Sequence, residues 1–290
     1  MSDIGKILRR DALRIGSTLG LDSSTARIEA QSLLQHVLRV QRAYLLAHPE
    51  QALDAIQQAT YAALLERRLQ GEPVAYILGE SEFFGLKFKV TPATLIPRSD
   101  TELLVELALQ RVPENRACRV LDMGTGSGAI ALSIAHSRPD AQLMAVDASE
   151  AALDVARENA RRLGIRNISL LQSDWFSALN GQRFDLIVSN PPYVATGDTH
   201  LSQGDLRFEP LSALASGADG MDDIRNIVGQ AGAYLENGSW LLLEHGYDQA
   251  AQVRDLLHQN GFRGIFSAKD IAGIDRVSGG TVERETRKYG

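Results

Sequence analysis

The sequence of 290 residues contains a single cysteine, Cys118. One cysteine excludes an internal disulfide. The sequence also lacks a Cys-x-x-Cys pair and any cluster of cysteine and histidine at the spacing of zinc ligands, so we predict no metal site. This composition is typical of a protein from a reducing compartment.

Long hydrophobic runs are also lacking. No apolar stretch approaches the roughly 20 residues that a membrane-spanning helix needs. Near the N-terminus, Lys6, Arg9, Arg10 and Arg14 interrupt the apolar residues, which argues against a signal peptide. The hydrophobic share of 44% and the charged share of 23% are those of an ordinary globular protein. We therefore expect a cytoplasmic location.

An excess of basic residues is lacking as well, and the formal net charge is -6. Residues 1–75 hold nine Lys/Arg and eight Asp/Glu, whereas the remainder holds 21 and 28. The larger part of the chain is thus acidic. This charge disfavours a protein that grips duplex nucleic acid through its phosphates. We expect no stable binding of nucleic acid and no binding to a membrane.

Three regions of the chain differ in their residue pattern. Residues 1–75 carry apolar side chains at spacings of three and four, which predicts an N-terminal helical domain with a docking role. Residues 76–95 contain an aromatic-rich, partly alternating segment around Gly85, which indicates a β-hairpin linker. Residues 96–290 then form the larger domain.

This larger domain has the pattern of an α/β fold. Ser99 with Glu102 three positions later, ahead of an apolar run, predicts a helix that starts with a capping box. From Arg119 onward, strand-like runs alternate with helical patterns, which predicts a mostly parallel sheet covered on both faces. Ligands of such sheets bind beyond the carboxyl ends of the strands. The predicted strands are 119–122, 143–146, 168–171, 186–189 and 240–243, and the predicted helices are 129–136, 149–163, 221–235 and 247–259.

A glycine-rich turn follows the first of these strands. Gly124, Gly126 and Gly128 alternate with Thr125 and Ser127, and glycine lets a backbone approach a ligand closely. The pattern fits the turn that binds NAD and equally a turn that binds S-adenosylmethionine. Asp122 ends the strand just before the glycines. A carboxylate there repels a pyrophosphate and attracts a cationic amino acid group, which favours S-adenosylmethionine.

Acidic and aromatic residues follow the next two strands. Asp147 lies nineteen positions past Gly128, where a carboxylate accepts hydrogen bonds from ribose hydroxyls. The alternative for Asp147 is a cap for the helix after it. Trp175 offers a ring that lies against an adenine, and Asp174 is either a partner of the adenine amino group or a turn cap.

The most specific stretch is Asn190-Pro191-Pro192-Tyr193, at the end of a predicted strand. The prolines stiffen the turn and remove two backbone donors, which leaves it rich in acceptors. The Asn190 side-chain oxygen and a nearby carbonyl can accept from one NH2 group, and Tyr193 can stack on a planar amide or base. Positioned acceptors suit methylation of a conjugated nitrogen without a general base. The alternative is a packed strand-exit turn.

The segments VLDMGTGSGAIALSIA, AVDAS, SDWFSAL and IVSNPPYV resemble the bacterial release factor glutamine methyltransferases. The resemblance covers nearly the whole larger domain and implies a class I methyltransferase (Rossmann-like) fold over residues 96–290. It also implies methyl transfer from S-adenosylmethionine to the glutamine amide in the Gly-Gly-Gln motif of peptide chain release factors. Asn190, Pro191, Pro192 and Tyr193 would bind the substrate, with Asn190 and Tyr193 catalytic. The implied cofactor-binding residues are Gly124, Thr125, Gly126, Ser127, Gly128, Asp147, Trp175 and Asn190.

Other functions share parts of this pattern. An adenine-N6 methyltransferase of DNA or RNA uses the same Asn-Pro-Pro-Tyr chemistry on a flipped base, but the acidic larger domain argues against it. A methyltransferase acting on ribosomal protein glutamine is a nearer alternative. Asp122 and the Asn-Pro-Pro-Tyr motif argue against an NAD-dependent oxidoreductase. The intact motif argues against a binding-only protein, because binding alone does not require its arrangement of acceptors. We expect a structural role for His245, because the proposed chemistry needs no histidine.

Overall fold

The computed structural model describes residues 3–283, which divide into two compact units. The first unit comprises the residues up to Glu80 together with Ser202–Phe208. The second comprises Ser81–Leu201 and the residues from Glu209 onward. Within residues 3–283, no helix combines the length and apolar character that crossing a bilayer requires.

The first unit is helical, as the sequence predicts for the N-terminal part of the chain. Asp3, Asp22 and Asp54 accept hydrogen bonds from backbone N–H groups at the starts of three of its helices. Ile4, Ile15, Leu33, Leu34 and other apolar side chains form its core. Its helices are α1 (Ile4–Leu19), α2 (Ser23–Leu38), α3 (Arg42–Ala47), α4 (Ala55–Leu69) and α5 (Val74–Leu78), and Ser202–Phe208 adds the short helix η3 (Gly204–Phe208).

A buried arginine joins the separate segments of this unit. Arg68 on α4 is only 2% exposed, and its guanidinium donates to both carboxylate oxygens of Glu29 on α2. A further N–H donates to Asp205 Oδ1 at 2.8 Å. Because a buried charge is stable only when its donors are paired, Arg68 ties Ser202–Phe208 to the helices.

The second unit begins inside the hairpin predicted within residues 76–95, at its second residue, Ser81. Strands β1 (Glu80–Phe83) and β2 (Leu86–Lys89) pair across a turn in which Phe84 and Gly85 both have positive φ. The buried Asn159 side chain exchanges hydrogen bonds with the Lys89 backbone and donates to Ser127 O. The hairpin is thereby attached to the glycine-rich turn.

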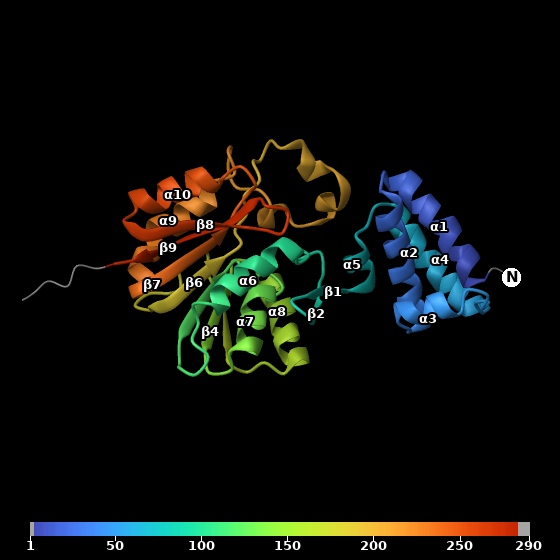
Figure 1. The fold of residues 1–290 in the computed structure, drawn as a ribbon, viewed down its shortest axis with the longest axis horizontal. Helices are drawn as coiled ribbons and strands as arrows, with labels where there is room; N and C mark the ends of the chain where they lie inside the picture. Colours follow the sequence, from blue (N-terminus) through green and yellow to red (C-terminus); the bar gives the residue numbers. More distant parts are fainter. Residues whose placement is uncertain (1–2, 284–290) are drawn as a thin grey trace, which may run out of the picture. The chain divides into compact units, whose positions relative to one another are not determined.

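A seven-stranded sheet with the order β5-β4-β3-β6-β7-β9-β8 forms the centre of this unit (Figure 1). The first five strands in that order are parallel and β9 is antiparallel to both neighbours, so the predicted mostly parallel sheet is confirmed. The strands are β3 (Arg119–Met123), β4 (Gln142–Asp147), β5 (Ile168–Gln172), β6 (Phe184–Ser189), β7 (Leu235–Glu244), β8 (Phe262–Lys269) and β9 (Asp275–Val282).

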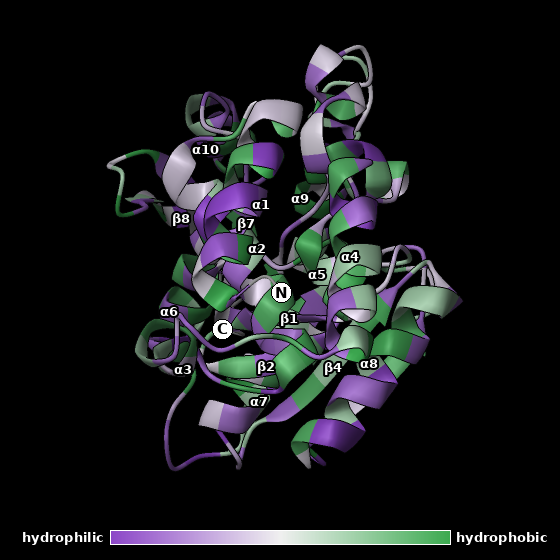
Figure 2. Ribbon diagram, turned by 90° about the vertical axis from the view of Figure 1, so that its right-hand side faces the viewer, coloured by the Kyte–Doolittle hydropathy of each residue, from purple (hydrophilic) through white to green (hydrophobic). Residues whose placement is uncertain are grey.

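Helices cover both faces of the sheet, as Figure 1 shows. One face packs Val120 and Leu186 against α6 (Glu102–Leu109) and α7 (Ala129–Ser137), with the end of α8 (Glu150–Leu163) beside them. The other face packs Leu121 and Ile187 against α9 (Asp222–Tyr234) and α10 (Ala250–Gln259). Successive strand residues enter opposite cores because a strand alternates its side chains. In Figure 2 hydrophilic and hydrophobic residues alternate along α8, as its one-sided burial requires.

Two local features differ from the sequence-based expectations. The capping box at Ser99 is wrong: a short helix, η1 (Ser99–Thr101), precedes α6, and the Glu102 carboxylate accepts from Phe84 N–H of the hairpin at 2.8 Å instead. Strands β8 and β9 were not predicted. In β9, a Cβ on Gly279 would lie 2.5 Å from Leu241 O, so close packing selects glycine over the branched residues that signal a strand.

Candidate active site

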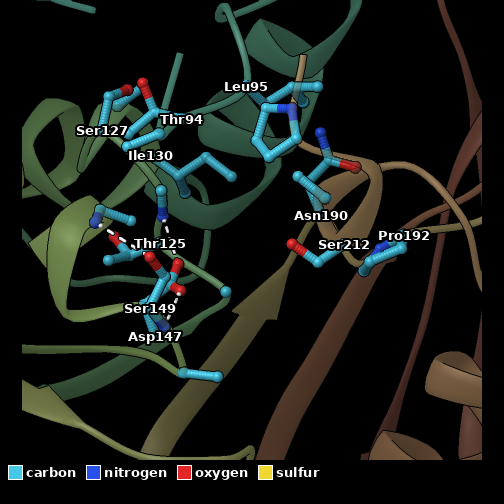
Figure 3. A pocket seen from close by; sticks show the side chains of 18 of the residues that line it. Thr94, Leu95, Thr125, Ser127, Ile130, Asp147, Ser149, Asn190, Pro192 and Ser212 are labelled. Atoms are coloured by element: carbon cyan, nitrogen blue, oxygen red, sulfur yellow. Dashed lines mark hydrogen bonds between the residues drawn. The ribbon is translucent and has the colours of Figure 1, made fainter. Parts of the chain in front are cut away.

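A cavity of about 550 Å³ lies beyond the carboxyl ends of β3, β4 and β6 in the second unit. Its size is within the range of small-molecule binding sites. Thr125, Asp147 and Ser149 gather on one side of it, and Asn190, Pro192 and Ser212 on the other (Figure 3). The lining residues include Thr94, Leu95, Arg98, Thr101, Gly124, Thr125, Gly126, Ser127, Ile130, Asp147, Ser149, Asp174, Trp175, Asn190, Pro192 and Ser212.

The glycine-rich turn has the left-handed backbone that the sequence suggests. The φ angles of Gly124, Gly126 and Gly128 are 69°, 56° and 83°, and side chains other than glycine rarely adopt such values. Gly128 caps α7, and a Cβ there would lie 2.9 Å from Leu132 Cδ1. The turn therefore depends on glycine for its conformation and, at Gly128, also for space.

Asp122 lies buried beneath this turn. Its Oδ2 accepts from Thr125 Oγ1 at 2.6 Å and from Ala131 N–H at 3.2 Å. No donor within residues 3–283 reaches Oδ1. Burial raises the pKa of Asp122 to about 7, while these two hydrogen bonds oppose the shift. The carboxylate thus holds the turn and keeps one acceptor atom unused.

Asp147 faces the cavity from the end of β4. Its Oδ2 accepts from Gly126 N–H at 2.8 Å and its Oδ1 from Ser149 N–H at 2.9 Å, as Figure 3 shows. Ser149, not Asp147, is the N-cap of α8. Burial raises the pKa of Asp147 above its ordinary value. The carboxylate is therefore held rigidly in the wall, with further lone pairs available to a ligand.

Trp175 belongs to the same wall. Its backbone has a positive φ of 46°, and its ring lies 3.7 Å from the position that a Cβ on Gly124 would take. The Ser173 hydroxyl donates to Trp175 O at 2.7 Å and accepts from Ala178 N–H at 3.0 Å. These bonds hold a sterically unfavourable residue in place, and Asp174 lines the cavity beside it.

The Asn-Pro-Pro-Tyr turn contributes two of its four residues to the cavity wall. Asn190 and Pro192 line it, whereas Pro191 is buried and Tyr193 is not among the lining residues. Asn190 Nδ2 donates to Thr101 Oγ1 at 3.2 Å. The Tyr193 hydroxyl donates to Glu244 Oε1 at 3.4 Å, and Gln249 Nε2 donates to Tyr193 O at 3.0 Å. The turn is thus held from three other segments.

Sequence reasoning missed Thr101, Glu244 and Gln249. Glu244 is 2% exposed at the carboxyl end of β7, and burial raises its pKa to about 7. An acid that ends an apolar strand was the only signal available in the sequence, and the same signal drew attention to Asp122 and Asp147. Nothing in the sequence pairs Thr101 with a residue 89 positions later.

Arg98 and Glu209 join two segments at the cavity rim. The Arg98 guanidinium donates to the buried Glu209 carboxylate, which also accepts from Ile96 N–H at 3.1 Å. Pro97 and Pro210 next to this pair both line the cavity. The ion pair therefore sets the distance between the two rim segments.

His245 lies outside the cavity lining. It is fully buried, with Nε2 2.8 Å from Ser278 Oγ and Nδ1 2.9 Å from Gly246 O. Burial lowers its pKa below the ordinary value. These contacts agree with the structural role expected for it. Within residues 3–283, no group of three or more His, Cys, Asp or Glu side chains is arranged to hold a metal ion.

Comparison with known proteins gives matches along nearly the whole chain. Residues 100–206 match the family model of the methyltransferase small domain, and residues 12–79 match that of the PrmC N-terminal domain. A release factor glutamine methyltransferase of Xylella fastidiosa is 51% identical over 254 residues, which are 88% of this chain and 92% of that protein. The protein of the same name from Escherichia coli is 49% identical over 256 residues, 88% and 92% of the two chains.

Two solved structures share the fold. The chain aligns with a methyltransferase from Pyrococcus furiosus at a TM-score of 0.52 and 16% identity, covering 77% of this chain and all of the other. It aligns with the hMettl16 catalytic domain at a TM-score of 0.56 and 14% identity, covering 77% and 83%. At such identities the likeness shows the class I methyltransferase fold alone.

Proposed function

The chain belongs to the release factor glutamine methyltransferase family, and on that premise we propose that it methylates the glutamine side-chain amide in the Gly-Gly-Gln motif of peptide chain release factors. The methyl donor is S-adenosylmethionine. Relatives about 50% identical over about nine tenths of the chain support the substrate, and the methyltransferase domain supports the donor. A cytoplasmic location, where release factors act, follows from this substrate.

The residues of the cavity fit S-adenosylmethionine. The turn from Gly124 to Gly128 offers close backbone approach, and Asp122 beneath it has a buried acceptor atom that no donor of the described residues reaches. A negative charge there suits a cationic ligand. Asp147 would accept from the ribose hydroxyls, and Trp175 would lie against the adenine. Thr125 and Ser127 complete this wall.

When bound, S-adenosylmethionine supplies an electrophilic methyl group on a positively charged sulfur. Asn190 Oδ1 and a carbonyl of the Pro191-Pro192 pair would accept from the glutamine NH2 group and hold its nitrogen toward that methyl. Such positioning lowers the barrier, because the loss of translational and rotational entropy occurs on binding and not in the methyl transfer itself. The acceptors also stabilise the positive charge that develops on nitrogen. Tyr193, the last residue of the same turn, would also hold the glutamine amide of the substrate.

One observation carries this assignment: the Asn190 side chain is anchored through its Nδ2 at the cavity wall. The bond occupies the donor end of the amide and leaves the acceptor end for a substrate NH2.

For the helical first unit, whose residues 12–79 match the PrmC N-terminal domain, we propose that it docks the release factor.

The test is transfer of labelled methyl from S-adenosylmethionine to an unmethylated release factor. A release factor with the motif glutamine changed to alanine and a duplex DNA serve as parallel acceptors. We expect label on the intact release factor alone, and a loss of at least about 100-fold in Asn190→Ala. Label on the DNA, or equal label on the two release factors, would refute the glutamine assignment and favour the adenine-N6 alternative or another acceptor.

A further inference from the structure

The wall of the cavity carries several carboxylates and one guanidinium. Asp147, Asp174 and Asp223 are the acids, and of the described residues that line the cavity Arg98 alone is basic. The Arg98 side chain is 37% exposed. A ligand with both a positive and a negative charge therefore meets complementary groups here, and Arg98 is the ionised group that suits its anionic end. The methyl transfer described above assigns no task to Arg98.

Glu209 fixes the position of this guanidinium. The Glu209 side chain has no exposed surface, and its carboxylate accepts from Arg98 Nη2 and from Ile96 N–H at 3.1 Å. A buried carboxylate is costly unless it is paired, so Glu209 keeps Arg98 beside it. Nη2 is the only atom of the guanidinium that is hydrogen-bonded within residues 3–283. The N–H groups on Nε and Nη1 are thus left for a ligand.

Arg98 lies on the same side of the cavity as Asn190. It is the residue that precedes η1, and Thr101 N–H donates to Arg98 O at 3.1 Å. The Thr101 hydroxyl oxygen in turn accepts from Asn190 Nδ2 at 3.2 Å. Asp147 lies on the opposite side of the cavity from Asn190 (Figure 3). The Asp147 side of the cavity is therefore acidic, and the positive group lies on the Asn190 side.

The methyl donor of the proposed reaction has its only anionic group at the end remote from the adenine. Its adenosine, which would lie at Asp147 and Trp175, is followed by the sulfonium and then by a methionine chain that ends in an ammonium and a carboxylate. The methyl group must face the substrate nitrogen at Asn190, so the methionine chain begins on that side as well. A guanidinium on that side can bind a carboxylate through two hydrogen bonds between charged groups.

We propose that Arg98, fixed by Glu209, binds the carboxylate of the methionine part of S-adenosylmethionine. This inference rests on the proposed function, because it takes that compound as the methyl donor. The product, S-adenosylhomocysteine, keeps the same carboxylate. Arg98 therefore stabilises the complexes with donor and product alike, and it contributes little to the methyl transfer step itself.

The first test compares S-adenosylmethionine with its decarboxylated form, which lacks only the carboxylate. Calorimetry measures the dissociation constants of both compounds for wild type and for Arg98→Met, which removes the charge and keeps a long side chain. We expect Arg98→Met to raise the dissociation constant of S-adenosylmethionine at least about tenfold, because hydrogen bonds between charged groups are lost. The dissociation constant of the decarboxylated compound should not rise. An equal rise for both compounds, or no rise for either, would overturn the proposal.

Two further variants control for folding and for net charge. Arg98→Met leaves the buried Glu209 without its charged partner, so a double variant with Glu209→Gln removes both charges and should show the same contrast between the two compounds. Arg225→Met is the matched control, because Arg225 is 47% exposed and is not among the lining residues. Salt screens a surface charge, so both dissociation constants should stay within about twofold of wild type. If this control changed the contrast as much as Arg98→Met does, net charge would explain the effect and the contact would be refuted.

Steady-state kinetics separate the carboxylate contact from a contact with the protein substrate. Arg98→Met should raise KM for S-adenosylmethionine and the inhibition constant of S-adenosylhomocysteine in parallel, at least about tenfold, while kcat changes far less. A raised KM for the release factor, with unchanged binding of both compounds, would place Arg98 at the protein substrate and refute the proposal. If wild type shows the contrast between the two compounds but methylates no release factor, the proposed substrate fails and the role of Arg98 stands. If wild type binds neither compound, the proposed donor and this inference fail together.

Discussion

Gly128→Ala should destabilise the second unit more than the same change at the neighbouring Gly126. Both glycines have positive φ, at 83° and 56°, so alanine at either position costs about 1–2 kcal/mol in backbone strain. A Cβ at Gly128 would also lie 2.9 Å from Leu132 Cδ1 and 3.3 Å from Ala156 Cβ, whereas at Gly126 no atom of residues 3–283 outside its chain neighbours would lie within 4 Å of a Cβ. Overpacking a tight core costs about 1–3 kcal/mol more.

The total expected for Gly128→Ala is therefore about 2–5 kcal/mol, against about 1–2 kcal/mol for Gly126→Ala. Urea unfolding monitored by tryptophan fluorescence measures the difference, because Trp175 and Trp240 both lie in the second unit. Equal losses in the two variants would refute the argument from close packing and leave only the backbone term. A loss below about 1 kcal/mol at both positions would refute the backbone term as well.

Two further perturbations test other parts of the structure. Glu29→Ala leaves the buried Arg68 guanidinium without its bidentate partner, so the free energy of unfolding of the first unit, measured by hydrogen exchange of its helices, should fall by about 3–5 kcal/mol. The control Asp205→Ala removes a partner of Arg68 that is 42% exposed and should cost about 1 kcal/mol or less. Equal losses in the two variants would contradict this ranking. Trp175→Ala should weaken S-adenosylmethionine binding by about 1–3 kcal/mol in calorimetry, the value of a base stacked on an aromatic ring; an unchanged dissociation constant would remove Trp175 from the cofactor site.

The helices and strands of the larger domain could be predicted where the spacing of apolar side chains and the residues at the ends of the element indicate the same structure. Strands β3, β4, β5 and β6 are five or six residues long, and apolar residues make up most of each strand. Helix α8 carries both its N-cap Ser149 and its C-cap Gly164. These signals are local, so the sequence determined them. The capping box at Ser99 failed because its glutamate found a distant partner, Phe84 N–H of the hairpin. A rule based on neighbouring residues cannot predict that a backbone N–H from a distant segment will bind the glutamate.

The candidate site shows the same division. The sequence by itself determined the glycine turn and Asn190, because positive φ needs glycine and two prolines after an asparagine stiffen a turn whatever surrounds it. Only the tertiary structure decided that Thr101 accepts a hydrogen bond from Asn190 and that Glu244 accepts one from Tyr193. These contacts join residues 51 and 89 positions apart, and their strength comes from burial. Burial is a property of the packed sheet and its helices, and no short segment of the sequence carries it.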